Sequence, residues 1–188
     1  MHRRITVVMA ATAALGIGAV GLVPAAGAAP RKKNEIRIVG GTVYKPGVMI
    51  GDNMRFNRNT TVKSGATVKI VNKGSAESGP HTLSLVKKSA LPLTFAQAAK
   101  CFRAAGVCGP LVAAHQFNPE DEEAPPAVLE YNAGAAGFGT MGDLETAGDS
   151  LFMAPGRGGS IKVTARKGSK LTFFCAIHPW MQGKITVR

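Results

Sequence analysis

The sequence predicts an all-β protein, a β-sandwich or a barrel, that carries a partly helical insertion. Four short runs in which apolar and polar residues alternate with a period of two indicate strands at residues 67–72, 82–86, 161–165 and 183–188. A fifth run, residues 171–174, is rich in residues that favour strands. Turn signals with glycine lie at 63–65, 72–74 and 167–169. The chain has 188 residues, 45% of them hydrophobic, which is enough for a buried core and excludes a wholly disordered chain.

The N-terminal residues indicate a secretory signal peptide. A basic head that ends at Arg4 is followed by residues 5–30, which carry no charge and contain an A-x-A cleavage site ending at Ala28. A retained membrane anchor is the alternative, and Arg3 with Arg4 leaves open which export route is used. We expect removal of residues 1–28, with cleavage between 28 and 30, and a protein of the periplasm, the cell envelope or the extracellular space without a membrane span. A basic flexible tail at 29–36 would then precede a single domain at 37–188.

The insertion is expected at about residues 89–154. Residues 93–105 are rich in helix formers, with Thr94 as N-cap, Gln97 three residues later and Gly106 as the end of the helix. Residues 110–156 are rich in Ala, Gly and Pro and predict a long ordered loop with one strand near 128–131.

Charge separates the insertion from the rest of the chain. The formal net charge of the whole chain is +12. Residues 31–103 hold 14 basic and 3 acidic residues, residues 157–188 hold 7 basic and none acidic, and residues 104–156 hold 8 acidic and none basic. No patch combines basic and aromatic residues, so nucleic-acid binding is not expected. Our hypothesis is that the acidic segment 120–148 flanks the functional end of the domain and shapes partner docking; a lid that only stabilises is the alternative.

Two of the three cysteines are expected to pair. Cys101 and Cys108 would be about 10 Å apart on one unbroken helix, which is too far for a disulfide. The break at Ala105 and Gly106 lets the chain fold back, so a local disulfide is feasible in an exported protein. A metal-binding pair is the alternative, with His115 as the nearby histidine, although His115 alone is expected to be structural or exposed.

The third cysteine belongs to a group of metal-ligand residues. The sequence CAIHPWM at 175–181 places Cys175, His178 and Met181 three residues apart in a tight loop between two predicted strands. A thiolate, an imidazole and a thioether that converge suit copper, and His81, in SGPHT at 78–82, would supply a second imidazole. The ordinary interpretation of each residue alone is a buried Cys, a core Met and an isolated His.

These residues resemble the copper-binding segments of the cupredoxins, the type 1 blue copper proteins. Residues 174–187 are similar to the family's copper loop, with the spacing C-x2-H-x2-M closest to that of amicyanin; plastocyanin and pseudoazurin have a longer gap before the Met. Residues 61–74 with Pro80 and His81 are similar to the first-ligand region, and residues 155–165 to the penultimate strand, so that about half of the chain is covered.

The resemblance implies a Greek-key β-sandwich, one type 1 copper ion per chain and electron transfer. Its copper ligands would be His81, Cys175, His178 and Met181, surrounded by Thr82, Pro179 and Trp180. Thr82 stands where many members have Asn, so the bond that braces the Cys loop in the family is in doubt here. Residues 89–154 have no counterpart in the compact members, so their docking surfaces do not transfer.

We therefore expect an exported electron carrier that is not an enzyme. A copper oxidase or a nitrite-reductase-like enzyme needs further paired histidines, and beyond the signal peptide the chain has only His81, His115 and His178. A copper-trafficking module with the same ligands and no redox partner is the other alternative. The expected partners are redox proteins of unknown identity, and the expected state is a monomer.

Overall fold

The computed structural model describes residues 34–45, 49–57, 59–103, 105–118, 120–121, 128–131 and 148–188. The chain divides into two units, Met1–Arg31 and Lys32–Arg188, and the described residues all belong to the second. The expected signal peptide and the first part of the basic tail lie outside the described residues.

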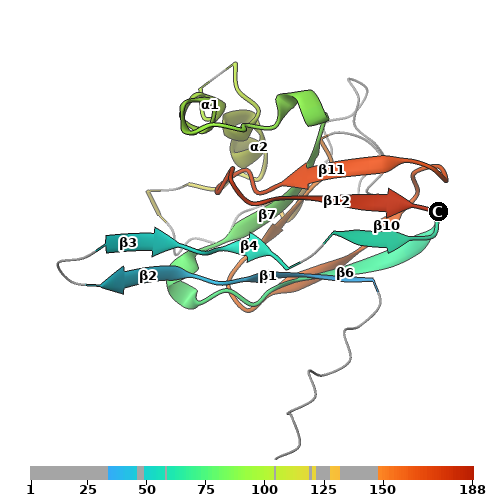
Figure 1. Ribbon diagram of the computed structural model, residues 1–188, viewed down its shortest axis with the longest axis horizontal. Coiled ribbons are helices and arrows are strands. Elements are labelled where there is room, and N and C mark those ends of the chain that lie inside the picture. The colour runs from blue at the N-terminus through green and yellow to red at the C-terminus, as the bar shows by residue number, and fades with distance from the viewer. Residues whose placement is uncertain are drawn as a thin grey trace, which may run out of the picture. The chain divides into compact units, whose positions relative to one another are not determined.

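Two β-sheets form the body of the second unit (Figure 1). One has four strands in the order β10 (Gly158–Val163), β6 (Ala66–Asn72), β1 (Glu35–Val39) and β4 (Arg55–Phe56). The other has six, in the order β5 (Thr60–Val62), β12 (Gln182–Val187), β11 (Lys170–Phe174), β7 (His81–Val86), β9 (Ser150–Met153) and β8 (Glu130–Tyr131). A separate hairpin pairs β2 (Thr42–Lys45) with β3 (Met49–Asp52). The helices are α1 (Phe95–Cys101) and α2 (Cys108–Ala114), with 3-10 turns η1 (Ala76–Ser78) and η2 (Lys88–Ala90).

The main core lies between the two sheets. Alternate residues of the long strands point into it, as a period of two requires. Its fully buried members include Ile36, Ile70, Leu83, Phe173 and Ile185, which come from both sheets. The predicted all-β sandwich with a partly helical insertion is thereby confirmed.

The outer face of the six-stranded sheet carries a second, smaller core. Every residue of β7 is buried, which happens to a strand only when both faces of the sheet are covered. The helices of the insertion supply that cover, and Figure 1 shows α1 and α2 over the part of the sheet that contains β7 and β11. The buried residues of this second core are Val86, Cys101, Cys108, Leu111, Phe174 and Ala176.

The start of the insertion agrees with its sequence signals. Thr94 caps α1 through a capping box, because its side chain accepts a hydrogen bond from the Gln97 N–H while the Gln97 side chain accepts one from the Thr94 N–H. The disulfide expected between Cys101 and Cys108 is present and joins the end of α1 to the start of α2, with 5.0 Å between the Cα atoms. Gly106 is needed in this connection, because a Cβ there would collide with the carbonyl of Cys101.

The expectation of one long loop over residues 110–156 is wrong at both ends. α2 continues to Ala114, and β9 pairs with β7 over residues 150–153. Gly109 and Pro110 suggest a loop in the sequence, but they lie in the first turn of α2, where proline is tolerated. β9 has four buried residues in a row, so it lacks the alternation that marks a half-buried strand.

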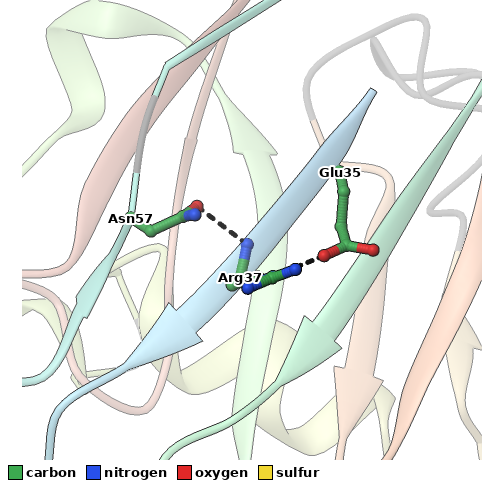
Figure 2. Close-up of polar contacts among 3 residues, drawn as sticks. All are labelled: Glu35, Arg37 and Asn57. Atoms are coloured by element: carbon green, nitrogen blue, oxygen red, sulfur yellow. Dashed lines mark hydrogen bonds and ion pairs between the residues drawn. The ribbon is translucent and has the colours of Figure 1, made fainter. Parts of the chain in front are cut away.

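The domain begins earlier than the boundary at residue 37 that the sequence suggests. β1 starts at Glu35 and pairs with β6, and Ile36 is fully buried, so residues 35 and 36 are not part of a flexible tail. Figure 2 shows how Arg37 holds this strand: its guanidinium pairs with Glu35, and its backbone N–H donates to Asn57 Oδ1 at 2.9 Å. The start of β1 is hard to recognise in the sequence, because basic residues precede it and a strand of five residues shows little alternation of its own.

Candidate metal centre

Two strands and one loop bring the metal-ligand residues to the same end of the six-stranded sheet. His81 is the first residue of β7, and Cys175 directly follows the last residue of β11. Because β7 and β11 are antiparallel, with Phe174 opposite Ser84, the start of one strand lies beside the end of the other. His178 lies in the loop that leads from Cys175 to β12.

This loop is closed by its own backbone. The Cys175 N–H donates to the Met181 carbonyl at 3.0 Å, and the Met181 N–H donates to the His178 carbonyl at 2.9 Å. Pro179 is buried, and its carbonyl accepts a hydrogen bond from the Gln182 side chain at 2.9 Å. The same Gln182 amide donates to the Pro92 carbonyl at 2.7 Å, which ties the start of the insertion to the loop.

Three ligand atoms converge within the described part of the chain. The Nδ1 atoms of His81 and His178 lie 3.8 and 3.7 Å from the Cys175 sulfur, and 3.0 Å from each other. A metal ion bonds to nitrogen at about 2.0 Å and to sulfur at about 2.3 Å, so two such bonds reach farther than any side of this triangle. His81, Cys175 and His178 therefore form a site that can hold one metal ion.

The surroundings of these atoms favour a bound cation over free ligands. Burial, and then the neighbouring His178, lower the pKa of His81 to about 3. Burial raises the pKa of the Cys175 thiol, although backbone N–H groups, that of Thr82 first, act in the opposite direction. A metal ion would replace the thiol proton and stabilise the thiolate. The Nε2 atom of His81 is buried without a hydrogen-bond partner among the described residues, whereas its Nδ1 atom faces the Cys175 sulfur and His178 and is the atom placed to bind a metal.

Thr82 braces the cysteine segment in spite of the difference from many cupredoxins. Its hydroxyl oxygen accepts a hydrogen bond from the Ala176 N–H at 2.7 Å, and its own N–H donates to the Cys175 sulfur at 3.3 Å. The His178 N–H donates to the same sulfur at 3.3 Å. A threonine hydroxyl is an acceptor as an Asn side chain is, so the brace is retained.

The remaining predicted site residues take different places. Met181 is 1% exposed and packs in the same core as Cys175, while Trp180 is 51% exposed and its ring lies 5.2 Å from that of His178. His115 is not part of the metal-ligand group. It is fully buried, and both of its ring nitrogens form hydrogen bonds with residues outside that group. Cys101 and Cys108 are joined to each other and are not a metal-binding pair.

Sequence reasoning missed the polar groups that support the site. No motif marks Ser84, Ser150 or Gln182, because the contacts that tie them to other elements are remote in the chain: Ser84 and Ser150 are 66 residues apart, and Gln182 and Pro92 are 90 apart. The acidic segment 120–148 lies mostly outside the described residues. Its last residue, Gly148, bonds to the Leu85 carbonyl, toward the end of β7 that is far from His81.

No protein-family model matches the chain, and no curated protein does. Among solved structures it is similar to a reduced auracyanin from the photosynthetic bacterium Roseiflexus castenholzii, with 19% identity, 83% of this chain and 98% of that chain covered, and a TM-score of 0.42. It is also similar to auracyanin A, a blue copper protein from the green thermophilic photosynthetic bacterium Chloroflexus aurantiacus, with 21% identity, 82% and 98% covered, and a TM-score of 0.40. For a multicopper oxidase the values are 16% identity, 82% of this chain but 41% of that chain, and a TM-score of 0.34.

The similar solved structures include cupredoxins, the family that the ligand motif resembles. In the described part of the chain, no helix combines the length and the apolar character that a membrane crossing needs.

Proposed function

We propose that this chain is an exported mononuclear type 1 copper protein that carries single electrons. The observation that carries the proposal is the convergence of two imidazole nitrogens and one cysteine sulfur in a buried position at the end of a rigid sandwich. Cysteine is a soft ligand that copper accepts, imidazole suits both of its oxidation states, and a carboxylate is absent from the group. We further propose Met181 as a weak fourth ligand. Its side chain is buried, and its backbone closes the loop by hydrogen bonds to both Cys175 and His178.

A bound copper ion would supply the one-electron chemistry by alternating between Cu(II) and Cu(I). The protein's contribution is to keep the ligands still while this happens, since a site that does not rearrange transfers electrons quickly. The antiparallel pairing of β7 and β11 fixes His81 relative to Cys175, and the loop hydrogen bonds fix His178. Buried ligands also exclude water from the thiolate.

His178 is the member of the group through which electrons would enter and leave. It is half-buried, whereas His81 and Cys175 are fully buried. Trp180 beside it lines an open hollow together with the exposed side chains of Leu93 and Phe95. An apolar surface next to the accessible ligand supports brief contact with a redox partner protein, which favours a carrier over a module that only stores or passes on copper.

A second catalytic copper is not supported by the histidines of the domain. Two are in the group described above, and the third, His115, uses one ring nitrogen on the Val128 carbonyl and the other on the Ser150 hydroxyl, at 2.7 Å each. A paired histidine site of the kind that copper oxidases use would need at least one of those atoms.

The decisive experiment is visible absorption of the copper-loaded domain. We expect an intense blue colour that ascorbate bleaches and ferricyanide restores, that Cys175→Ser abolishes, and that survives in the Cys101→Ser/Cys108→Ser control.

Met181→Leu should keep the fold, since this exchange conserves volume and costs less than about 1.5 kcal/mol. It should raise the reduction potential, because loss of the thioether donor disfavours Cu(II). Blue colour that persists in Cys175→Ser would overturn the site, and a colourless protein that takes up only Cu(I) would favour trafficking.

Export is tested independently of copper. The charge and hydropathy pattern of residues 1–30 supports it. The mass of the protein recovered from the cell envelope or medium should correspond to loss of the residues up to Ala28; full-length protein in the cytoplasm would contradict export.

A further inference from the structure

A line of buried hydroxyl groups connects the insertion to the cysteine segment. It runs across the outer face of the six-stranded sheet, from the end of α2 through β9 and β7 to the residue after Cys175. We call it the hydroxyl relay, and its members are Ala176, Thr82, Ser84, Ser150, His115 and Val128. The four side chains in it, those of Thr82, Ser84, Ser150 and His115, are at most 3% exposed.

The distances along the relay are those of good hydrogen bonds. Near the metal centre, the Thr82 Oγ1 atom lies 2.7 Å from the Ala176 nitrogen and 2.9 Å from the Ser84 Oγ atom. Near the insertion, Ser150 Oγ lies 2.7 Å from Ser84 Oγ and 2.7 Å from His115 Nε2.

The two ends of the relay determine where every proton lies. The Ala176 N–H can only donate, and the Val128 carbonyl can only accept, so His115 carries its proton on Nδ1. The Nε2 atom of a neutral His115 then accepts from the Ser150 hydroxyl. In turn, Ser150 accepts from Ser84 and Ser84 from Thr82, so that each hydroxyl donates once along the relay.

This order of donors and acceptors strengthens the Thr82 oxygen as an acceptor for the Ala176 N–H. Its proton is used on Ser84, so a lone pair remains directed at the Ala176 N–H. Hydrogen bonds in such a row polarise one another, so a hydroxyl that donates is a stronger acceptor than one that does not. The order also agrees with the chemistry of His115, because burial lowers its pKa and keeps the ring neutral.

We propose that His115 is a positioning residue for the metal centre: through Ser150 and Ser84 it orients the Thr82 hydroxyl, which holds the backbone next to Cys175. This inference rests on the proposed function for its metal-centre part, while the relay itself can be tested without metal. It assigns the insertion a role in the site, although no residue of the insertion belongs to the metal-ligand group.

The test compares variants that break the relay with one that only disturbs packing. Ser84→Ala removes the central hydroxyl with little change in volume, and His115→Phe removes the far end. Phe152→Leu is the matched control, because the Phe152 ring packs 5.7 Å from the His115 ring and takes no part in the relay. Thr82→Ser keeps the hydroxyl and is the rescue variant for Thr82→Val.

The first measurement is hydrogen exchange of the Ala176 amide in the metal-free domain. We expect Ser84→Ala and His115→Phe to speed its exchange about five- to tenfold relative to neighbouring amides, as the weakening of one buried hydrogen bond predicts. Thr82→Val should speed it further, and Thr82→Ser should restore it. If Phe152→Leu of equal thermal stability speeds the exchange as much as His115→Phe does, the relay has no specific effect and the inference is wrong.

The second measurement is the visible spectrum and reduction potential of the copper-loaded variants. Both relay variants should move band position and potential in the same direction, and the control should leave them unchanged. If the protein takes up no copper, the proposed function fails while the exchange measurement still decides the relay. Should exchange respond and the spectrum and potential stay constant, the relay is structural only, and His115 has no positioning role.

Discussion

Thr82 contacts the cysteine segment at two points, and this shows how single residues set the properties of the site. Its backbone N–H donates to the Cys175 sulfur and its side chain accepts from the next residue, so one threonine orients both the thiolate and the chain behind it. Groups that are not ligands themselves thus help to orient the ligands.

His115 gives the metal-free domain a pH-dependent stability. Burial lowers its pKa below the ordinary value of 6.5, and burial also lowers that of His81. As the pH falls below 6.5, the unfolded chain takes up protons that the folded chain refuses, so the free energy of unfolding decreases; above 6.5 the contribution is complete. The Tyr131 ring faces the His115 ring, with 6.1 Å between the ring centroids.

Chemical denaturation of the metal-free domain between about pH 5 and pH 8 measures this effect. We expect the slope of stability against pH in the acid range to shrink in His115→Phe, by at most one proton, and to keep its value in Phe152→Leu. An unchanged slope in His115→Phe would mean that this histidine is accessible to protons in the folded state.

At the scale of elements, the α1 and α2 pair is a short unit held by a disulfide. The two helices have seven residues each, too short to be stable alone, and they bury few side chains against the sheet. The disulfide spans seven residues, and closing a loop of this size contributes roughly 2 to 3 kcal/mol in the chain-entropy account.

Removing this disulfide should loosen the insertion before the sandwich. In Cys101→Ser/Cys108→Ser we expect the amides of α1 and α2 to exchange faster by one to two orders of magnitude, as a loss of roughly 2 to 3 kcal/mol predicts. The amides of β6 and β11 should change much less. Hydrogen exchange followed by mass spectrometry distinguishes the two regions, and equal acceleration in both would show that insertion and sandwich unfold as one unit.

How far the elements follow from the sequence depends on how they are buried. β6, β10, β11 and β12 were predictable because one of their faces is polar or because their residues favour strands. β7 was predictable too, because Thr82 and Ser84 alternate with leucines although the whole strand is buried. β9 was not, since three apolar residues follow one another in it, and neither was β4, which has two residues. The ligand residues between Cys175 and Met181 were predictable because their spacing is a local motif. His81 was predictable because it stands at the start of a predicted strand. The hydroxyl relay joins residues from distant elements, and nothing local in the sequence marks it.

At the scale of the whole molecule, the charge of the domain should be visible in its reaction with small redox reagents. Residues 157–188 hold 7 basic and no acidic residues. On α1 the exposed Lys100 lines a second hollow, which shares Pro92 with the hollow beside Trp180. A net positive protein attracts anionic reagents, and salt screens this attraction over about 10 Å at 0.1 M.

We expect oxidation of the reduced copper protein by ferricyanide to slow as ionic strength rises, and oxidation by a cationic cobalt complex to accelerate. Stopped-flow bleaching and recovery of the blue colour give both rates. The variant Lys100→Glu should weaken both dependences, whereas Lys162→Glu, on the other sheet, serves as the control. Rates that respond to salt with the same sign for both reagents would contradict steering by the charge of the protein.

The double burial of β7 has a consequence for anyone who shortens this protein. Because the described metal-ligand group takes no residue from 89–147, that segment could be taken for an accessory that can be deleted. The outer side of β7 and β11, with Val86, Phe174 and Ala176, would then become an uncovered apolar surface in water. A trimmed chain would expose an apolar sheet face and lose His115 and Val128 from the hydroxyl relay, so the sheet depends on this segment for its cover.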